Sequence, residues 1–175
     1  MIRSTIFNIV FYGFTAISCV LCLPFLFLPK KDAMWAVRLF VHSTMFFERR
    51  ILGLDYEVRG LQNLPKGSCI VAAKHESAYE TTKLNILFDD PAIILKRELL
   101  RIPLWGQFLA KVEPIAIDRS QGKESMEQII IGAKRVQAQG RPIVIFPQGT
   151  RVSPSKKVSE RPYKIGAARM FCSVS

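Results

Sequence analysis

A run of 23 residues without a charged side chain, Ile6–Leu28, constrains this chain more than any other feature. About 20 apolar residues suffice to cross the hydrocarbon core of a bilayer as a helix. A cleaved signal peptide would have a shorter apolar region and end in small residues, whereas this run ends in LPFLFLPKK. We therefore predict a membrane anchor, with an in-plane or re-entrant segment as the alternative. Lys30, Lys31 and Arg38 follow the run and only Arg3 precedes it, which predicts that its C-terminal side is cytoplasmic.

The hydropathy pattern divides the chain into three segments. Residues 1–31 form the predicted transmembrane or membrane-embedded segment. Residues 32–54 contain AMWAVRLFVHSTMFFERR, which is typical of an amphipathic helix at the membrane interface; a core helix of the following domain is the alternative. Polar and apolar residues then alternate in short blocks, and we expect residues 55–175 to form the folded domain.

The charge of the chain indicates an anionic partner. The formal net charge is +11, although 49% of the residues are hydrophobic. Nucleic acid is disfavoured because no basic stripe is interleaved with aromatic residues, and lipid headgroups or phosphorylated substrates explain the charge equally well. The four cysteines have neither a disulfide-scaffold pattern nor the spacing of a metal site, so we expect reduced thiols and no metal. These cysteines are Cys19, Cys22, Cys69 and Cys172.

Strands and helices alternate along the rest of the chain, which predicts an α/β fold with helices on the faces of a sheet. Short apolar runs bounded by turn residues predict the strands, and apolar residues at helical spacing predict the helices. The predicted strands cover residues 55–60, 68–75, 91–96, 112–119 and 142–146. The predicted helices cover residues 81–88, 97–112 with a break at Pro103, and 125–140.

Polar clusters follow three of these predicted strands. In α/β sheets, ligands bind beyond the carboxyl ends of the strands. The first cluster contains His75 and Glu80, which can work together only if His75 ends a strand and Glu80 lies in the first turn of the next helix. In that arrangement the carboxylate would orient the imidazole and stabilise its protonated form. A purely structural histidine is the alternative.

The other two clusters contain arginines that are suited to phosphate. Arg119 follows the strand at 112–119, and Arg151 closes the sequence FPQGTR after the last strand. Guanidinium groups bind phosphate in a bidentate manner, and Gly149 lets the backbone approach a ligand closely. Surface ion pairing is the alternative for each arginine.

Three motifs in this order resemble those of the glycerolipid acyltransferases, in particular the bacterial 1-acyl-sn-glycerol-3-phosphate acyltransferases. They are KHESAYE, EPIAIDR and FPQGTR, and LKRELLRIPLWGQFLAKV is similar to the segment between the first two. The resemblance covers roughly Asp55 to Ala168. It implies an α/β fold with a mixed central sheet flanked by helices, the glycerolipid acyltransferase fold, preceded by a membrane helix or helical hairpin. It also implies that residues 55–175 are the acyltransferase domain.

The resemblance further implies a reaction and a role for each site residue. His75 would be the general base for the free hydroxyl of 1-acyl-glycerol-3-phosphate (lysophosphatidic acid), and Glu80 would orient it. The hydroxyl oxygen would attack an acyl thioester, acyl-CoA or acyl carrier protein, to form phosphatidic acid without a resident cofactor. Phosphate and glycerol would be bound by Arg119, Gln148, Gly149, Thr150 and Arg151. The resemblance places the protein at the cytoplasmic face of a bacterial inner membrane.

Three departures from the family pattern affect this interpretation. Glu80 replaces the family's Asp in the first motif, and Gln148 replaces its Glu in the third. The chain also ends shortly after YKIGAARM, before a fourth, apolar motif, and we expect that it lacks the C-terminal part of the domain. The alternative function is therefore that of a catalytically weak family member that only binds anionic lipid.

Overall fold

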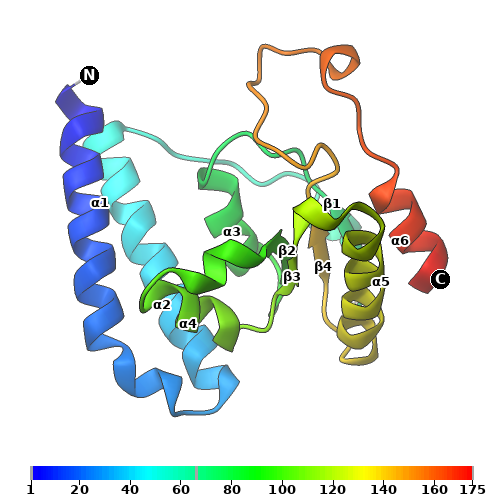
Figure 1. Cartoon of the computed structure of the whole chain (residues 1–175). Helices are drawn as coiled ribbons and strands as arrows, with labels where there is room; N and C mark the ends of the chain where they lie inside the picture. The colour runs from blue at the N-terminus through cyan, green and yellow to red at the C-terminus, as the bar shows by residue number, and fades with distance from the viewer. Residues whose placement is uncertain (1, 66, 175) are drawn as a thin grey trace.

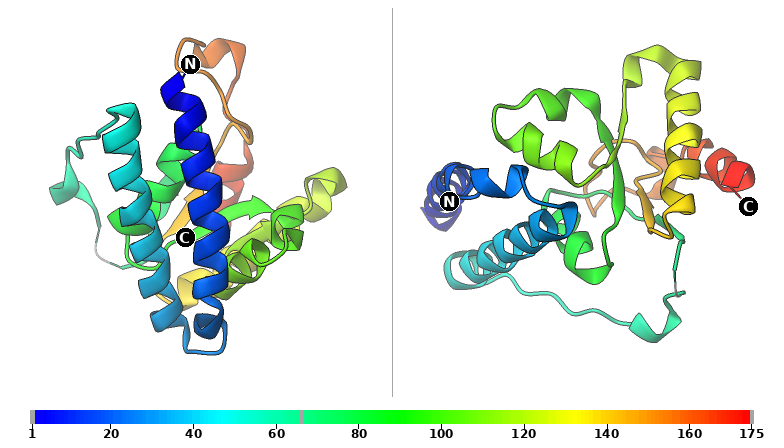
Figure 2. Two further views of the ribbon diagram at one scale, coloured as in Figure 1. Left: turned by 90° about the vertical axis from the view of Figure 1, so that its left-hand side faces the viewer. Right: turned by 90° about the horizontal axis from the view of Figure 1, so that it is seen from below.

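Four short strands form a sheet between two layers of helices, with α1 and α2 beyond one layer (Figures 1 and 2). The structure is a computed structural model that describes residues 2–65 and 67–174. The helices are α1 (Ile2–Leu21), α2 (Lys30–Phe47), α3 (Tyr79–Leu87), α4 (Trp105–Lys111), α5 (Gly122–Ala138) and α6 (Gly166–Val174). The strands are β1 (Ile70–Ala72), β2 (Ala92–Lys96), β3 (Ile115–Ile117) and β4 (Ile143–Ile145).

The sheet has the strand order β1-β4-β2-β3, and all of its described pairings are parallel. Val144 in β4 lies opposite both Val71 in β1 and Ile93 in β2. The predicted α/β fold with flanking helices is confirmed, but the sheet is parallel where the resemblance implied a mixed one. The reason is that a helix crosses over between successive strands and returns the chain to the same end of the sheet.

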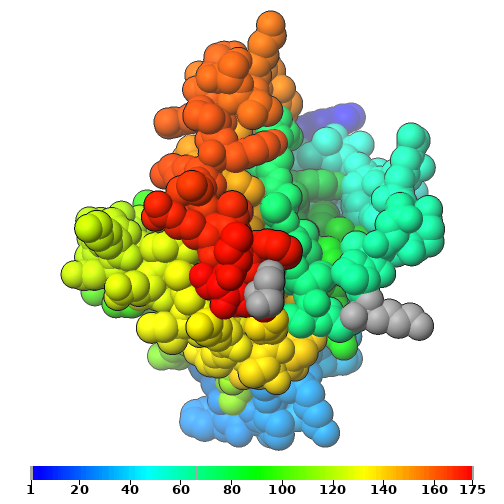
Figure 3. Space-filling model, turned by 90° about the vertical axis from the view of Figure 1, so that its right-hand side faces the viewer, coloured from blue at the N-terminus to red at the C-terminus, as the bar shows by residue number. Residues whose placement is uncertain are grey.

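Alternate residues of the strands pack against helices on opposite faces. One face packs on α5 and α6 and forms the larger core, in which Ala133, Val136 and Met170 are fully buried. The other face carries Val144 and Phe146, which pack against Leu84 of α3. Helix α6, which no sequence pattern predicted, lies beside α5 on the first of these two faces (Figure 3).

The uncharged run does not form one continuous helix. Helix α1 ends at Leu21, and a 3₁₀ turn at Leu23–Leu26 follows because Pro24 cannot continue the α-helical hydrogen bonds. The chain then reverses into α2, so that α1 and α2 form a helical hairpin (Figure 2). The ring of Phe14 packs against Phe40, with centroids 5.5 Å apart, and against Phe47 at 5.1 Å.

Helix α1 leaves most of its apolar side chains exposed. Cys19 is its one buried residue, whereas Ile2, Ile9 and Leu21 are at least 70% exposed. The helix is long and apolar enough to cross a bilayer, judged by length and composition. Such an uncovered apolar surface is unusual for a helix in water and typical of a surface that contacts lipid or another protein.

The segment at 55–60 is not the strand that the sequence predicted. It runs as extended chain from the end of α2 to the sheet (Figure 1) and has no strand partner in the described chain. Its polar side chains bond locally, since Arg59 pairs with Glu57 at 2.9 Å and Asp55 accepts the N–H of Tyr56. Alternation alone could not reveal that no neighbouring strand was available.

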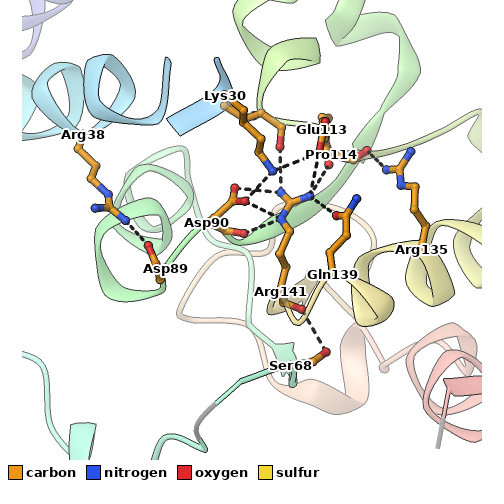
Figure 4. Close-up of polar contacts among 11 residues, drawn as sticks. Lys30, Arg38, Ser68, Asp89, Asp90, Glu113, Pro114, Arg135, Gln139 and Arg141 are labelled. Atoms are coloured by element: carbon orange, nitrogen blue, oxygen red, sulfur yellow. Dashed lines mark hydrogen bonds and ion pairs between the residues drawn. The ribbon is translucent and has the colours of Figure 1, made fainter. Parts of the chain in front are cut away.

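An ionic cluster ties the hairpin to the amino-terminal edge of the sheet (Figure 4). Arg141, which precedes β4 and is 7% exposed, pairs with Asp90 at 2.8 Å and with Glu113 at 3.4 Å. Lys30 at the start of α2 also pairs with both carboxylates, at 2.6 and 3.2 Å. Asp90 and Glu113 have φ of 49° and 52°, an uncommon backbone conformation for L-residues, and the Arg141 guanidinium also reaches the carbonyl oxygen of each.

Candidate active site

The parallel sheet brings the three predicted clusters to one edge. His75 lies three residues beyond β1, Arg119 two residues beyond β3, and Thr150 and Arg151 five and six residues beyond β4. The carboxyl ends of parallel strands meet at the same edge, so these residues converge although up to 76 positions separate them in the sequence. All four line one cavity.

His75 and Glu80 are in direct contact. The Nδ1 atom of His75 lies 2.5 Å from the Oε1 atom of Glu80. Glu80 is in the first turn of α3, as the predicted strand-to-helix arrangement requires. The His75 ring stacks on Phe146, with centroids 4.2 Å apart, which holds the imidazole plane against the end of β4. Contacts therefore restrain the imidazole at its edge and on one face.

Glu80 is held in its ionised form by hydrogen bonds. Its carboxylate accepts the backbone N–H groups of Glu76 and Ser77 and the Ser77 hydroxyl, at 3.0–3.3 Å. Burial alone would raise the pKa of Glu80, but hydrogen bonds from His75 and Ser77 outweigh it and lower the pKa below the ordinary 4.5. An ionised Glu80 accepts the Nδ1–H of His75, which leaves the lone pair on Nε2.

The lowered pKa of Glu80 predicts a specific loss of stability in acid. The unfolded chain binds this proton more tightly than the folded one, so the ionised carboxylate stabilises the fold above pH 4.5. That contribution is lost as the pH falls through the lowered pKa. We expect the free energy of unfolding of the wild type to exceed that of Glu80→Gln at about pH 6, and the difference to shrink towards about pH 3.

Denaturant titrations of both proteins across this pH range measure the effect. Glu76→Gln is the matched control, because Glu76 is near the same site but pairs with Lys74 at 2.8 Å rather than with His75. Parallel pH curves for the wild type and Glu80→Gln would contradict the prediction.

The FPQGTR turn presents backbone and basic groups to the same edge. Gly149 has φ of 68°, and a side chain there would meet Lys164, whose Nζ lies 3.3 Å from the position of a Cβ. Arg119 Nη1 donates a hydrogen bond to the Gly149 carbonyl oxygen, which joins the loop after β3 to this turn. Thr150 and Arg151 follow in the cavity wall.

Gln148 is placed differently from the prediction that it contacts substrate. Its side chain is buried, with 3% of its surface exposed. Its Nε2 atom donates a hydrogen bond to the Arg161 carbonyl oxygen at 3.0 Å. Its Oε1 atom is buried without a hydrogen-bond partner among the described residues. The position of a side chain in a tight turn depends on the backbone angles, which the motif spacing did not reveal.

The cavity between the sheet and the hairpin has a volume of about 560 Å³. Its polar end carries His75 and the arginines, and the remainder of its wall is mostly apolar. The sequence did not predict that the hairpin and α4 contribute to this wall, because neither contains a motif that indicates a cavity. The apolar wall includes Phe11, Cys19, Phe40, Ile93, Trp105 and Phe108.

This arrangement can remove a proton from a hydroxyl group next to an anionic group, within reach of a long apolar chain. Among residues 2–65 and 67–174, no group of three or more His, Cys, Asp or Glu side chains is arranged to hold a metal ion. The acyltransferase family model matches residues 55–175, which is more than half of the chain. The chain belongs to the acyltransferase family.

Two curated relatives of this chain are both named 1-acyl-sn-glycerol-3-phosphate acyltransferase. The Pseudomonas aeruginosa protein is 42% identical over 108 residues, which cover 62% of this chain and 42% of that protein. The Saccharomyces cerevisiae protein is 31% identical over 159 residues, which cover 90% of this chain and 50% of that protein. The chain therefore spans about half the length of these relatives.

A solved structure shares the fold. The 1-acyl-sn-glycerophosphate (LPA) acyltransferase PlsC from Thermotoga maritima superposes with a TM-score of 0.76 at 21% sequence identity. The superposition covers 99% of this chain and 70% of that chain. The glycerolipid acyltransferase fold that the sequence motifs implied is thereby confirmed for this chain, including its N-terminal helices.

Two potential nucleophiles near the strand ends do not face His75: Ser77 is hydrogen-bonded elsewhere, and Cys69 is remote. The Ser77 hydroxyl donates to Glu80 at 3.0 Å and supports the His75 partner instead of facing His75 itself. Cys69 precedes β1, at the opposite end of that strand from His75, and burial raises the pKa of its thiol. The role of Ser77 could have been suspected from its place three residues before Glu80, next to a helix start.

Proposed function

We propose that this protein transfers an acyl group from a thioester to the free hydroxyl of 1-acyl-glycerol-3-phosphate and forms phosphatidic acid for phospholipid synthesis. The observation that carries the proposal is the His75–Glu80 contact of 2.5 Å in a cavity that also contains Arg119 and Arg151. Both curated relatives described above are named for an acyltransferase acting at this acceptor.

In the proposed reaction, Nε2 of His75 takes the proton of the acceptor hydroxyl as its oxygen attacks the thioester carbonyl carbon. The C–S bond then breaks, and the leaving thiolate receives the proton from the imidazolium. Glu80 fixes the Nδ1–H tautomer and stabilises the imidazolium between these two proton transfers. No acyl-enzyme intermediate is required. The acyl donor, acyl-CoA or acyl carrier protein, is a co-substrate, and the proposed reaction uses no resident cofactor.

We also propose that the hairpin places this site at a membrane. Residues 1–31 would lie in the bilayer and residues 32–54 at its interface, and residues 55–175 would carry the reaction. The exposed apolar surface of α1 supports this, as does the cavity, whose wall combines hairpin residues with His75. The excess of lysine and arginine after α1 supports an orientation with the catalytic domain on the cytoplasmic side, and we propose a bacterial inner membrane as the location.

Recognition of the acceptor phosphate is expected to depend on Arg151. Its guanidinium is in the cavity wall and has no ion-pair partner among the described residues, so it is available for an anionic ligand. A hydrogen bond to a charged group is worth about 1.5–3 kcal/mol, so Arg151→Gln should lower kcat/KM for lysophosphatidic acid by about 10- to 150-fold. Acyl transfer by purified protein in liposomes measures it.

Two comparisons make this test specific to the phosphate. Monoacylglycerol, which lacks the phosphate, should be a poor acceptor, and its kcat/KM should be nearly the same in the wild type and in Arg151→Gln. Arg161→Gln removes the same charge from the neighbouring loop and should leave both acceptors unaffected. An equal loss for both acceptors in Arg151→Gln would exclude phosphate recognition by this residue. A folded wild type that binds anionic lipid but transfers no acyl group would favour the lipid-binding alternative.

A further inference from the structure

A buried ion pair lies one helical turn from Glu80 and takes no part in the proposed reaction. Lys83 donates from Nζ to Oε2 of Glu48, and the two side chains are only 4% and 7% exposed. Glu48 begins the π-helical turn at Glu48–Leu52, which ends the hairpin, whereas Lys83 belongs to α3. The pair therefore connects the hairpin to the helix that carries Glu80.

Helix α3 depends on its packing to hold its position. It has nine residues, and the preceding Ala78 makes no side-chain cap. Isolated helices of this length are marginal in water. Lys83 and Leu84 are its two buried side chains; Leu84 contacts the sheet and Lys83 contacts the hairpin. Without the Lys83 contact, Leu84 would be the one buried side chain that fixes the rotation of α3, and Glu80 would depend on the hydrogen bonds of its own carboxylate to stay beside His75.

The charge of Lys83 also matters for Glu80. Residues three apart on a helix are neighbours, so an unpaired Lys83 ammonium would compete with His75 for the Glu80 carboxylate. In the structure its Nζ instead contacts Glu48, the Thr82 hydroxyl and the face of the Tyr79 ring, 4.0 Å from the centroid. Glu48 thus keeps this cation away from the carboxylate that His75 uses.

We propose that Glu48 and Lys83 are positioning residues for the His75–Glu80 pair, through which the hairpin sets the orientation of α3. Their catalytic consequence rests on the function proposed above, whereas their effect on the His75–Glu80 contact does not. Removing one partner leaves a buried charge unpaired, but replacing both with apolar residues of similar size often preserves stability. The double variant Glu48→Leu/Lys83→Met therefore separates positioning from folding.

The first measurement reads the His75–Glu80 contact directly. The chain has two histidines, His42 and His75, so ¹⁵N-histidine labelling gives two imidazoles, which His75→Ala assigns. Glu80→Gln provides the His75 nitrogen resonances without the carboxylate partner. We expect the folded double variant to shift the His75 resonances towards those of Glu80→Gln, while those of His42 stay in place.

The second measurement is acyl transfer. Misplacing a catalytic group by about 1 Å can cost about 100-fold, so kcat of the double variant should fall about 10- to 100-fold with little change in KM. The matched control is Arg38→Gln/Asp89→Asn, which removes an exposed ion pair of 2.5 Å between the hairpin and the domain. It should change neither the His75 resonances nor kcat.

Each outcome decides the proposal. His75 resonances that coincide with the wild type in the folded double variant would overturn it, whether or not kcat falls. Shifted resonances support it, and they do so even if the wild type transfers no acyl group, in which case the proposed function fails alone. Circular dichroism verifies folding, and Glu48→Gln/Lys83→Gln, with polar side chains of similar length, replaces the apolar variant if that one does not fold.

Discussion

Replacing His75 with alanine should lower the rate of acyl transfer to lysophosphatidic acid by about 10²- to 10⁴-fold, the usual contribution of a general base. Nε2 of His75 has no hydrogen-bond partner among the described residues, and its ring lines the cavity. The other histidine, His42, is an exposed residue of α2 that is not among the residues lining the cavity, so it cannot replace His75 there. Turnover measured with saturating acyl donor in liposomes should therefore fall nearly to the level without enzyme.

The control for this prediction is His42→Ala, which removes the other histidine and should leave turnover unchanged. His75→Ala should still bind anionic lipid, since the arginines and the hairpin are intact. A His75→Ala protein that keeps more than about a tenth of the wild-type kcat would exclude general base catalysis by this residue.

Replacing Arg141 with methionine should lower the free energy of unfolding by about 1–3 kcal/mol, the cost of leaving buried hydrogen-bond acceptors without their donor. The Arg141 guanidinium bonds Asp90, the Val112 carbonyl at 3.0 Å and the Gln139 side chain at 3.0 Å (Figure 4). Methionine fills a similar volume but donates no hydrogen bond, so the Val112 carbonyl and the Gln139 side chain lose this donor and Asp90 keeps only Lys30. Denaturant or thermal unfolding in detergent measures the loss.

Two further variants test whether this loss comes from the several hydrogen bonds of the Arg141 guanidinium. Arg141→Lys should recover only part of the stability, because an ammonium cannot reach acceptors on several sides as the planar guanidinium does. Arg135→Met removes an exposed arginine whose contact in Figure 4 is a single hydrogen bond of 3.2 Å to the Pro114 carbonyl, and should cost less than about 0.5 kcal/mol. Equal losses in Arg141→Met and Arg135→Met would show that the cluster contributes little.

Local sequence was sufficient to predict much of this site. An apolar strand followed at once by polar residues is a local pattern, and it predicted that His75, Arg119 and Arg151 would meet at one edge of a sheet. The His75–Glu80 spacing was compatible with only one layout, a strand end followed by a helix start, and the structure has that layout. The same reasoning failed for Gln148, because side-chain direction in a turn depends on backbone angles rather than on spacing.

Several features depended on contacts between distant segments. The extended segment at 55–60 alternates between polar and apolar residues like a strand, but it has no strand beside it among the described residues. The local sequence does not reveal whether a neighbouring strand is available to form hydrogen bonds. Phe146 belongs to the FPQGTR motif, but its contact with the His75 ring depends on the pairing of β1 with β4. The cavity wall likewise combines residues of α1, α2 and α4 that have no shared motif.

The sequence by itself determined the uncharged apolar run at the N-terminus, the alternation of strands and helices, and the chemical groups at the strand ends, because these follow from periodicity, turn residues and side-chain chemistry. Only the tertiary structure decided that the hairpin folds back to close the cavity and that Arg141 joins three loops. The tertiary structure also showed that Lys83 forms an ion pair with Glu48, which lies 35 positions earlier in the sequence. Burial and ion pairing depend on which segments come together, and that depends on the packing of the whole chain.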